Sequence, residues 1–180
     1  MPEDGGMNIV ETDPPANSLI APFALRPGHY TDCFEVVCAR DVTLAAFITA
    51  FYTQPLFRAE RLVLRIAARA PSTDAQVAAL ADGSAGDFAV WRVAERREDE
   101  VFLAERSGST CSWLQAGAGV LRFGSVVVPV AGRGGALTLG PVFQSLLGAH
   151  KLYSRALLAG AARRVCQGLP TCSSGTRWPW

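Results

Sequence analysis

The sequence lacks most of the features that identify functional classes. It has no excess of charge, since 17 basic and 16 acidic residues leave a net charge of +1. A protein that binds nucleic acid usually carries a clustered basic surface. The charge balance therefore gives no reason to expect a nucleic-acid partner.

A long uninterrupted apolar segment is also lacking. The most apolar stretch, residues 42–57, contains three threonines, a glutamine and a proline, and it is shorter than the roughly 18–20 apolar residues that a membrane span requires. Residues 1–18 contain no basic region followed by an apolar core, so they do not resemble a secretory signal. We therefore expect a cytoplasmic protein without a transmembrane segment. Met1 and Met7 are both open as the true start.

The cysteines form no metal-binding pattern. Their number is odd, and without a secretory signal this predicts reduced thiols that act as small apolar residues. The five are Cys33, Cys38, Cys111, Cys166 and Cys172. His29, Cys33 and Cys38 lie near one another in the chain, but they have no fourth partner and fit no common zinc spacing, so no metal is expected.

Motifs for cofactors and nucleophiles are missing too. The glycine-rich run at residues 131–140 has no G-K-[ST] ending, and Leu137 takes the place of the third glycine of G-x-G-x-x-G. A hairpin turn explains this run, so no cofactor is expected. Ser109 and Ser112 are not within a G-x-S-x-G motif. The catalytic residues are therefore unknown.

The residues that are present predict a globular domain, because 49% are hydrophobic and only 18% are charged. We expect a flexible arm over residues 1–18, one domain over residues 19–166 and a flexible tail over residues 167–180. Within the domain we expect a strap with two prolines, a first strand, two helices, a linker with one short helix, four hairpin strands and a long last helix. The strap is assigned to residues 19–28, the first strand to 30–38, and the two helices to 44–51 and 55–66, with Asp41 as N-cap of the first helix. The linker is assigned to residues 71–87, with Ser72 or Thr73 at the start of its short helix. The hairpin strands are assigned to residues 88–94, 100–105, 110–116 and 120–130, and the last helix to 142–165.

The last helix shows the clearest periodicity. Apolar residues from Val142 to Val165 recur on one broad face, and Pro141 suits the first turn. The hairpins make the sheet antiparallel, and the last helix is the largest apolar element left to cover it. We therefore predict an α+β fold with a curved antiparallel sheet wrapped on a long C-terminal helix, and two helices between the first and second strands. A gap between the sheet and the helix would suit an apolar ligand.

The order of these elements resembles the helix-grip fold of START and polyketide-cyclase-like domains, and more narrowly a bacterial family of uncharacterised START-like domains. The resemblance covers residues 28–166 and is carried by the strings YTDCFEV, REDEVFLAE, TCSWL, LRFGSVVVP and LLGAHKLYSRALLAGA. It implies a cavity between sheet and helix that binds lipids, polyketides or other apolar molecules. A minority of such domains are enzymes, and the resemblance carries over no catalytic residue.

Six residues are candidates for lining that cavity. His150 and Tyr153 share a helix face and could position a carbonyl or hydroxyl group or move a proton. Trp113 shares a strand face with Cys111 and Gln115, opposite Ser112 and Leu114. The six candidates are Trp91, Trp113, Arg122, Phe123, His150 and Tyr153. The alternatives are a filled core for the aromatic residues, a structural role for His150 and Tyr153, and a solvated sheet face for Arg122.

Three hypotheses follow. The first is a domain that binds an apolar small molecule between sheet and helix. The second is an enzyme with cyclase, isomerase or hydrolase-like chemistry in the same cavity. The third is an interaction module that docks through the strap at residues 19–25 and through Trp178 and Trp180. The sequence leaves the oligomeric state open.

Overall fold

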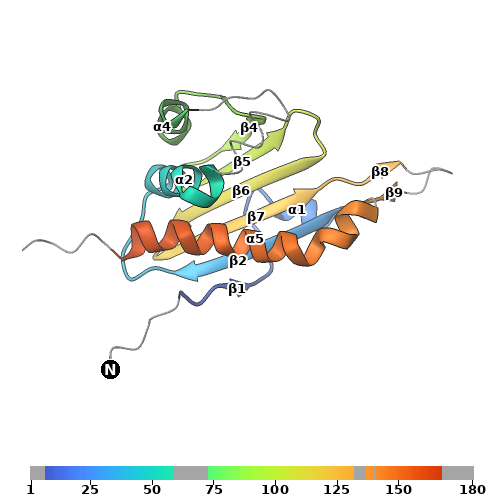
Figure 1. Ribbon diagram of the computed structural model, residues 1–180, viewed down its shortest axis with the longest axis horizontal. Helices are drawn as coiled ribbons and strands as arrows, with labels where there is room; N and C mark the ends of the chain where they lie inside the picture. Colours follow the sequence, from blue (N-terminus) through green and yellow to red (C-terminus); the bar gives the residue numbers. More distant parts are fainter. Residues whose placement is uncertain (1–6, 59–72, 132–136, 140, 168–180) are drawn as a thin grey trace, which may run out of the picture.

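The computed structural model describes residues 7–58, 73–131, 137–139 and 141–167 (Figure 1). The fold is α+β, with a seven-stranded antiparallel sheet in the order β1-β2-β7-β6-β5-β4-β3 and a C-terminal helix. The sheet is open, and a two-stranded sheet, β8-β9, stands apart from it. The elements are β1 (Val10–Glu11), α1 (Ala21–Ala24), β2 (Tyr30–Val37), α2 (Leu44–Thr53), α4 (Asp74–Asp82), β3 (Asp87–Phe88), β4 (Trp91–Arg96), β5 (Glu100–Glu105), β6 (Thr110–Gly117), β7 (Val120–Val127), β8 (Val130–Ala131), β9 (Leu137–Thr138) and α5 (Pro141–Cys166).

The hairpin region and the last helix agree closely with the sequence prediction. Strands β4 to β7 pair antiparallel with their neighbours in chain order, and α5 begins at Pro141. The strand expected at residues 88–94 is corrected, because Ala89 has a positive φ of 52° and turns the chain between β3 and β4. The strand expected to run to residue 130 ends at Val127, two residues before Pro129, which has no N–H to donate to a ladder.

The helices that follow β2 agree with the prediction in part. Helix α2 is present, but its N-cap is Thr43 instead of Asp41, since Thr43 Oγ1 accepts a hydrogen bond from the Ala46 N–H at 3.2 Å. Residues 55–58 are helical, and the rest of the second expected helix lies outside the described residues. The short helix expected from Ser72 or Thr73 is confirmed as α4, which Thr73 and Gln76 begin with a capping box.

Three helices cover one face of the sheet. Helix α5 packs along β2 and β7, α2 packs on β6 and against α5, and α4 packs on α2 (Figure 1). The buried side chains on this face form the larger core cluster, which includes Phe34, Phe47, Phe51, Leu114 and Leu158. The expectation that α5 is the partner of the sheet is therefore incomplete, because α2 shares the same face.

The opposite face of the sheet is also covered, which the sequence analysis did not predict. Leu19 and Ile20 are buried there with Trp113 in a second cluster. The expected extended strap contains the short helix α1, with Pro22 in its first turn. Gly124 makes this packing feasible, because a Cβ at that position would lie 2.7 Å from Ile20 Cδ1 and 3.2 Å from Trp113 Cε3.

The N-terminal segment contacts both the sheet and α5. Val10–Glu11 forms edge strand β1 against Phe34 and Glu35, and the Glu11 carboxylate accepts hydrogen bonds from Lys151 and Arg155 of α5. Residues 7–18 of the expected flexible arm therefore include a strand that pairs with β2, and the flexibility of the arm stays a prediction. A two-residue strand is too short to show alternation, so no sequence pattern marked it. Residues 1–6, and the tail from residue 168 onward, lie outside the described residues.

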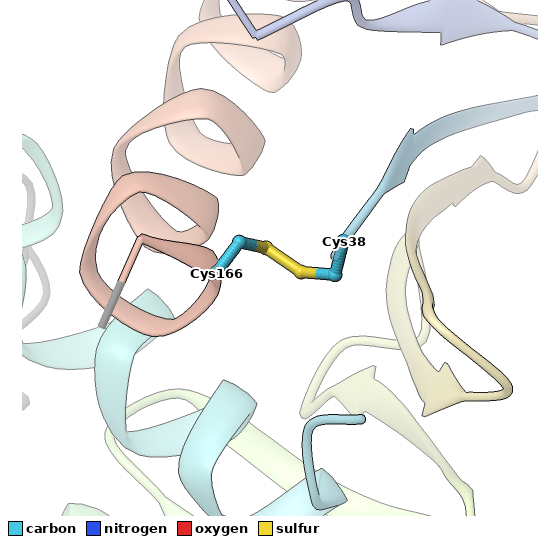
Figure 2. Close-up of a disulfide and its surroundings, with 2 residues drawn as sticks. All are labelled: Cys38 and Cys166. Carbon is cyan, nitrogen blue, oxygen red and sulfur yellow. A yellow bond between two sulfur atoms is a disulfide. The ribbon is translucent and has the colours of Figure 1, made fainter. Parts of the chain in front are cut away.

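A disulfide joins the end of β2 to the end of α5 (Figure 2). It links Cys38 to Cys166, which are 128 residues apart in sequence and have Cα atoms 5.1 Å apart. This corrects the prediction that the cysteines are reduced, although Cys33 and Cys111 are free and buried. Cys172 lies outside the described residues. Because disulfides persist mainly in oxidising environments, the cysteines no longer support the cytoplasmic expectation. Among the helices in the described part of the chain, none is both long and apolar enough to cross a membrane.

Candidate functional site: a pocket between the terminal helix and the sheet

A pocket of about 240 Å³ lies between the middle of α5, strands β6 and β7, and the end of α2. Its walls are largely apolar, with Phe51 and Phe57 on one side and Phe123 on the sheet. Tyr153 and Leu157 of α5 border it from the helix. The pocket is thus on the helix-covered face of the sheet, where the sequence analysis expected a gap.

Small side chains on the sheet leave this space open. Ser112 of β6 and Ser125 of β7 are cross-strand partners, and both line the pocket. The next pair on the same face, Leu114 and Phe123, is large and fills the core. The two serines fill less of the space under α5 than the large pair would, although Ser125 Oγ still lies 2.8 Å from His150 Nε2 of the helix. Their small size leaves room between α5 and the sheet at this place.

Two buried polar groups in the pocket wall have no hydrogen-bond partner among the described residues. They are the Ser154 hydroxyl, on a residue that is only 1% exposed, and the Trp91 indole N–H. An unsatisfied buried donor costs about 1–3 kcal/mol, and most such groups in native proteins bind a protein group or a water molecule. Both groups therefore have unused capacity to donate a hydrogen bond to a molecule in the pocket.

A buried carboxylate lies beside the pocket. Asp32, whose side chain is 1% exposed, accepts hydrogen bonds from the Ser125 N–H at 2.8 Å, the Ser125 hydroxyl at 2.6 Å and the Tyr30 hydroxyl at 2.9 Å. His150 Nε2 lies 3.2 Å from Asp32 Oδ2 and 2.8 Å from Ser125 Oγ. We call Tyr30, Asp32, Ser125 and His150 the Asp32 cluster. Two of its members, Ser125 and His150, line the pocket.

The Asp32 cluster stabilises a negative charge. Burial alone would raise the pKa of Asp32, but hydrogen bonds from His150 and Ser125, together with the charge of His150, outweigh it and hold this pKa below its ordinary value. Burial, followed by the charge of Asp32, raises the pKa of Tyr30. Tyr30 is therefore a neutral donor to an ionised carboxylate. The carboxylate places a negative potential at this end of the pocket.

The cluster contains a serine, a histidine and an aspartate, but not in the geometry of a hydrolase triad. In a triad the acid contacts Nδ1 of the histidine and the serine contacts Nε2. Here Ser125 Oγ and Asp32 Oδ2 both face His150 Nε2. The single Ser125 hydroxyl proton points to Asp32, so His150 Nε2–H is the donor toward both oxygens. His150 Nε2 is therefore not placed to remove the Ser125 proton, as the histidine of a triad does.

The structure brings four of the six candidate residues to this pocket. Trp91, Phe123, His150 and Tyr153 all line it. Trp113 lies on the opposite face of the sheet, and its indole N–H donates to Glu100 at 2.7 Å. The side assignment made from strand alternation is confirmed for β6, since Trp113 and Leu114 lie in different core clusters.

Arg122 is also away from the pocket. It alternates with Phe123 on β7, and it donates to Glu35 at 3.0 Å and to Gln115 at 3.1 Å. Its side chain is 25% exposed, which agrees with a partly solvated sheet face instead of a charged group in the cavity. Whether any of the six candidates binds a ligand stays a prediction.

The three residues considered as metal ligands, His29, Cys33 and Cys38, do not form a metal-binding group among the described residues. Cys33 lies in the second core cluster, and Cys38 is in the disulfide. In the ranges that the structure describes, no three histidine, cysteine, aspartate or glutamate side chains are arranged to hold a metal ion. The glycine-rich run at residues 131–140 includes the end of β8 and all of β9, which pair antiparallel, while residues 132–136 are outside the description.

Among the polar residues of this region that were not predicted as site candidates are Asp32, Ser125 and Ser154. One signal was present for Asp32, because it alternates with Phe34 and Val36 and so must share their buried face. The string FGSVV likewise places Ser125 on the face of Phe123. A charged or small polar residue in an apolar strand face could have been treated as a site candidate.

The chain matches no protein-family model, no curated protein and no solved structure. The START-like resemblance therefore stays an expectation, and the pocket geometry alone carries the functional argument.

Proposed function

We propose that this protein binds an apolar small molecule in the pocket between α5 and the sheet, as a helix-grip, START-like domain would. One observation carries the proposal: Ser154 and Trp91 have buried polar groups without partners, and both border the same largely apolar pocket. Ligand pockets combine apolar walls with a few polar groups of this kind. A bound molecule with a hydrogen-bonding group would remove the cost of leaving these two groups unsatisfied.

The volume limits the size of the molecule. Pockets for drug-sized ligands enclose roughly 300–1,000 Å³, and this pocket has about 240 Å³. An engineered apolar cavity of about 150 Å³ accommodates benzene. The pocket thus suits one ring with a short substituent, or two small fused rings. Long acyl chains and extended polyketides, which the resemblance implies, are too large for it.

Ethylbenzene is a suitable apolar probe for the test. We expect it to bind the wild type and Ser154→Ala, which leaves the cavity open, in ligand-observed NMR. Ser154→Leu fills the same space from the helix, and Ser112→Val fills it from the sheet if the first variant does not fold. Both filled variants should lose binding. Equal binding of ethylbenzene to the wild type and to the filled variants, or failure of the wild type to bind any small aromatic probe, would contradict the proposal.

Acid–base catalysis in the same pocket is a second candidate, favoured by one contact. His150 borders the pocket, and its Nε2 lies 3.2 Å from the Asp32 carboxylate. A carboxylate in that position orients an imidazole. The test is the exchange of the methyl protons of acetophenone in D₂O, followed by NMR. Catalysis predicts exchange faster than in buffer and loss of the acceleration in His150→Gln. Exchange at the buffer rate would exclude this candidate for that probe.

The interaction-module hypothesis has less support. Leu19 and Ile20 of the strap are 6% and 0% exposed, because they pack against the sheet of the same chain. Leu25 is 87% exposed and is available to a partner, but it is a single side chain. Trp178 and Trp180 lie outside the described residues.

A further inference from the structure

The polar groups of the pocket restrict the chemistry of its ligand. The Trp91 indole can only donate a hydrogen bond, and the Ser154 hydroxyl can donate or accept one. Both are buried, and neither has a partner among the described residues. A molecule that satisfies Trp91 must therefore carry an acceptor. A purely hydrocarbon ligand would leave both groups unsatisfied.

The charged groups around the pocket restrict the chemistry of the ligand further. None of the described residues that line it is a lysine or an arginine. The ionised Asp32 is instead in contact with two lining residues, through Ser125 Oγ at 2.6 Å and His150 Nε2 at 3.2 Å. A carboxylate ligand would lie near this negative charge, and the histidine that lines the pocket, His150, is already in contact with Asp32. Such a position is unfavourable for a second negative charge in a partly buried site.

From these constraints, we infer that the pocket takes a neutral carbonyl compound of one or two rings, with the carbonyl oxygen accepting hydrogen bonds from Ser154 and Trp91. The class includes small aromatic ketones, esters and lactones. The ring would lie against Phe51, Phe57 and Phe123, which form the apolar walls. This inference rests on the proposed function, and it adds the polarity and charge of the ligand.

Three probes of similar size separate the contributions of the ring, the carbonyl group and a negative charge to binding. Acetophenone has a ring and a carbonyl group, ethylbenzene has the ring alone, and benzoate adds a negative charge. The variants are Ser154→Ala and Trp91→Phe, which remove one donor each and keep the walls apolar. Ser145→Ala is the control, because Ser145 is exposed on the same helix. Dissociation constants come from ligand-observed NMR titrations at pH 8.

The informative quantity is the affinity for acetophenone divided by the affinity for ethylbenzene, since the hydrophobic difference between the two probes cancels when variants are compared. Loss of one neutral hydrogen bond should lower this ratio about 3–10-fold in each donor variant. Ser145→Ala should leave it unchanged. Benzoate should bind the wild type at least about 10-fold more weakly than acetophenone does.

Each outcome has a separate meaning. A ratio that is the same in the wild type and both donor variants overturns the inference, because Ser154 and Trp91 then do not bind the carbonyl. Benzoate binding as tightly as acetophenone overturns the assignment of a neutral ligand. In both of these outcomes the proposed function still holds if ethylbenzene binds the wild type. If none of the three probes binds the wild type, the proposed function itself fails.

Discussion

Asp32 on β2 and His150 on α5 are 118 residues apart in sequence, yet Asp32 Oδ2 and His150 Nε2 lie 3.2 Å apart. This contact joins the terminal helix to the sheet at the edge of the pocket. Tyr30 supports it, since its hydroxyl donates to the same Asp32 oxygen and its ring meets the His150 ring edge-on, with centroids 6.0 Å apart. A buried charge is therefore among the groups that hold the helix at the edge of the pocket.

The first prediction concerns that charge. Because the pKa of Asp32 is lowered in the folded protein, its stabilisation is fully present above the ordinary aspartate pKa of about 3.9 and is lost as the pH falls through the folded-state pKa. Asp32→Asn should lower the free energy of unfolding by about 2–4 kcal/mol at pH 7. The difference from the wild type should shrink below about pH 4. Urea unfolding at several pH values measures the loss of unfolding free energy at pH 7 and its decrease at low pH.

Asp41→Asn is the control for this series, because Asp41 is exposed. It should change stability by less than about 0.5 kcal/mol. A difference between Asp32→Asn and the wild type that does not depend on pH would show that the carboxylate is not the stabilising group.

The second prediction concerns two glycines on α5. A Cβ at Gly160 would clash with the side-chain amide of Gln54, which is buried and donates to the Phe51 and Leu157 carbonyl oxygens. Gly160→Ala should therefore destabilise the protein by about 1–3 kcal/mol. Gly148 has no atom within 4 Å of its Cβ position, so Gly148→Ala should stabilise it by about 0.5–1 kcal/mol through helix propensity. Thermal unfolding of both variants tests this prediction. Tm shifts of the same sign in Gly160→Ala and Gly148→Ala would contradict it.

The third prediction concerns the disulfide. The double variant Cys38→Ser, Cys166→Ser should be less stable by about 2–5 kcal/mol, since the bridge closes a loop of 128 residues. Dithiothreitol should lower the Tm of the wild type toward that of the double variant. The Tm of the double variant should not respond to the reductant, which is the control for other effects of dithiothreitol.

The fourth prediction concerns the two free buried thiols. Burial raises the pKa of Cys33 to about 12 and that of Cys111 to about 11. Few thiolates are present at pH 8, so both should react with Ellman's reagent at least about 100-fold more slowly in the folded state than in urea. A Cys172→Ser background leaves these two as the free thiols. Rapid labelling of the folded protein would contradict their burial.

The parts of the fold that were predictable from sequence depend on local patterns. Strand β5 was assigned at its observed bounds because it is a short apolar run between charged and turn-rich segments. Helix α5 was assigned within a residue at each end because its helical periodicity is clear. The hairpins followed from the short turns between strands. Ala89 was missed because a positive φ at a non-glycine residue has no clear sequence signal.

The parts that were not predictable depend on register and on long-range packing. Asp32 faces Ser125 only because β2 pairs with β7 in one particular register, and the sequence shows no direct sign of which strands are neighbours. The Cys38–Cys166 pairing requires the end of α5 to reach the end of β2. Trp113 was placed on the correct strand face, but the cover over that face, Leu19 and Ile20, was treated as a wrapping strap.

The Cys38–Cys166 bridge also has a mechanical consequence. A pulling force applied to the two ends of the chain would pass through the bond between these sulfur atoms and bypass residues 39–165. The oxidised protein should therefore extend under tension only by the segments on either side of the bridge, and the intervening strands and helices would carry no load. Reduction would expose them to the full force, so an optical trap should record a much longer final extension in the presence of a reductant.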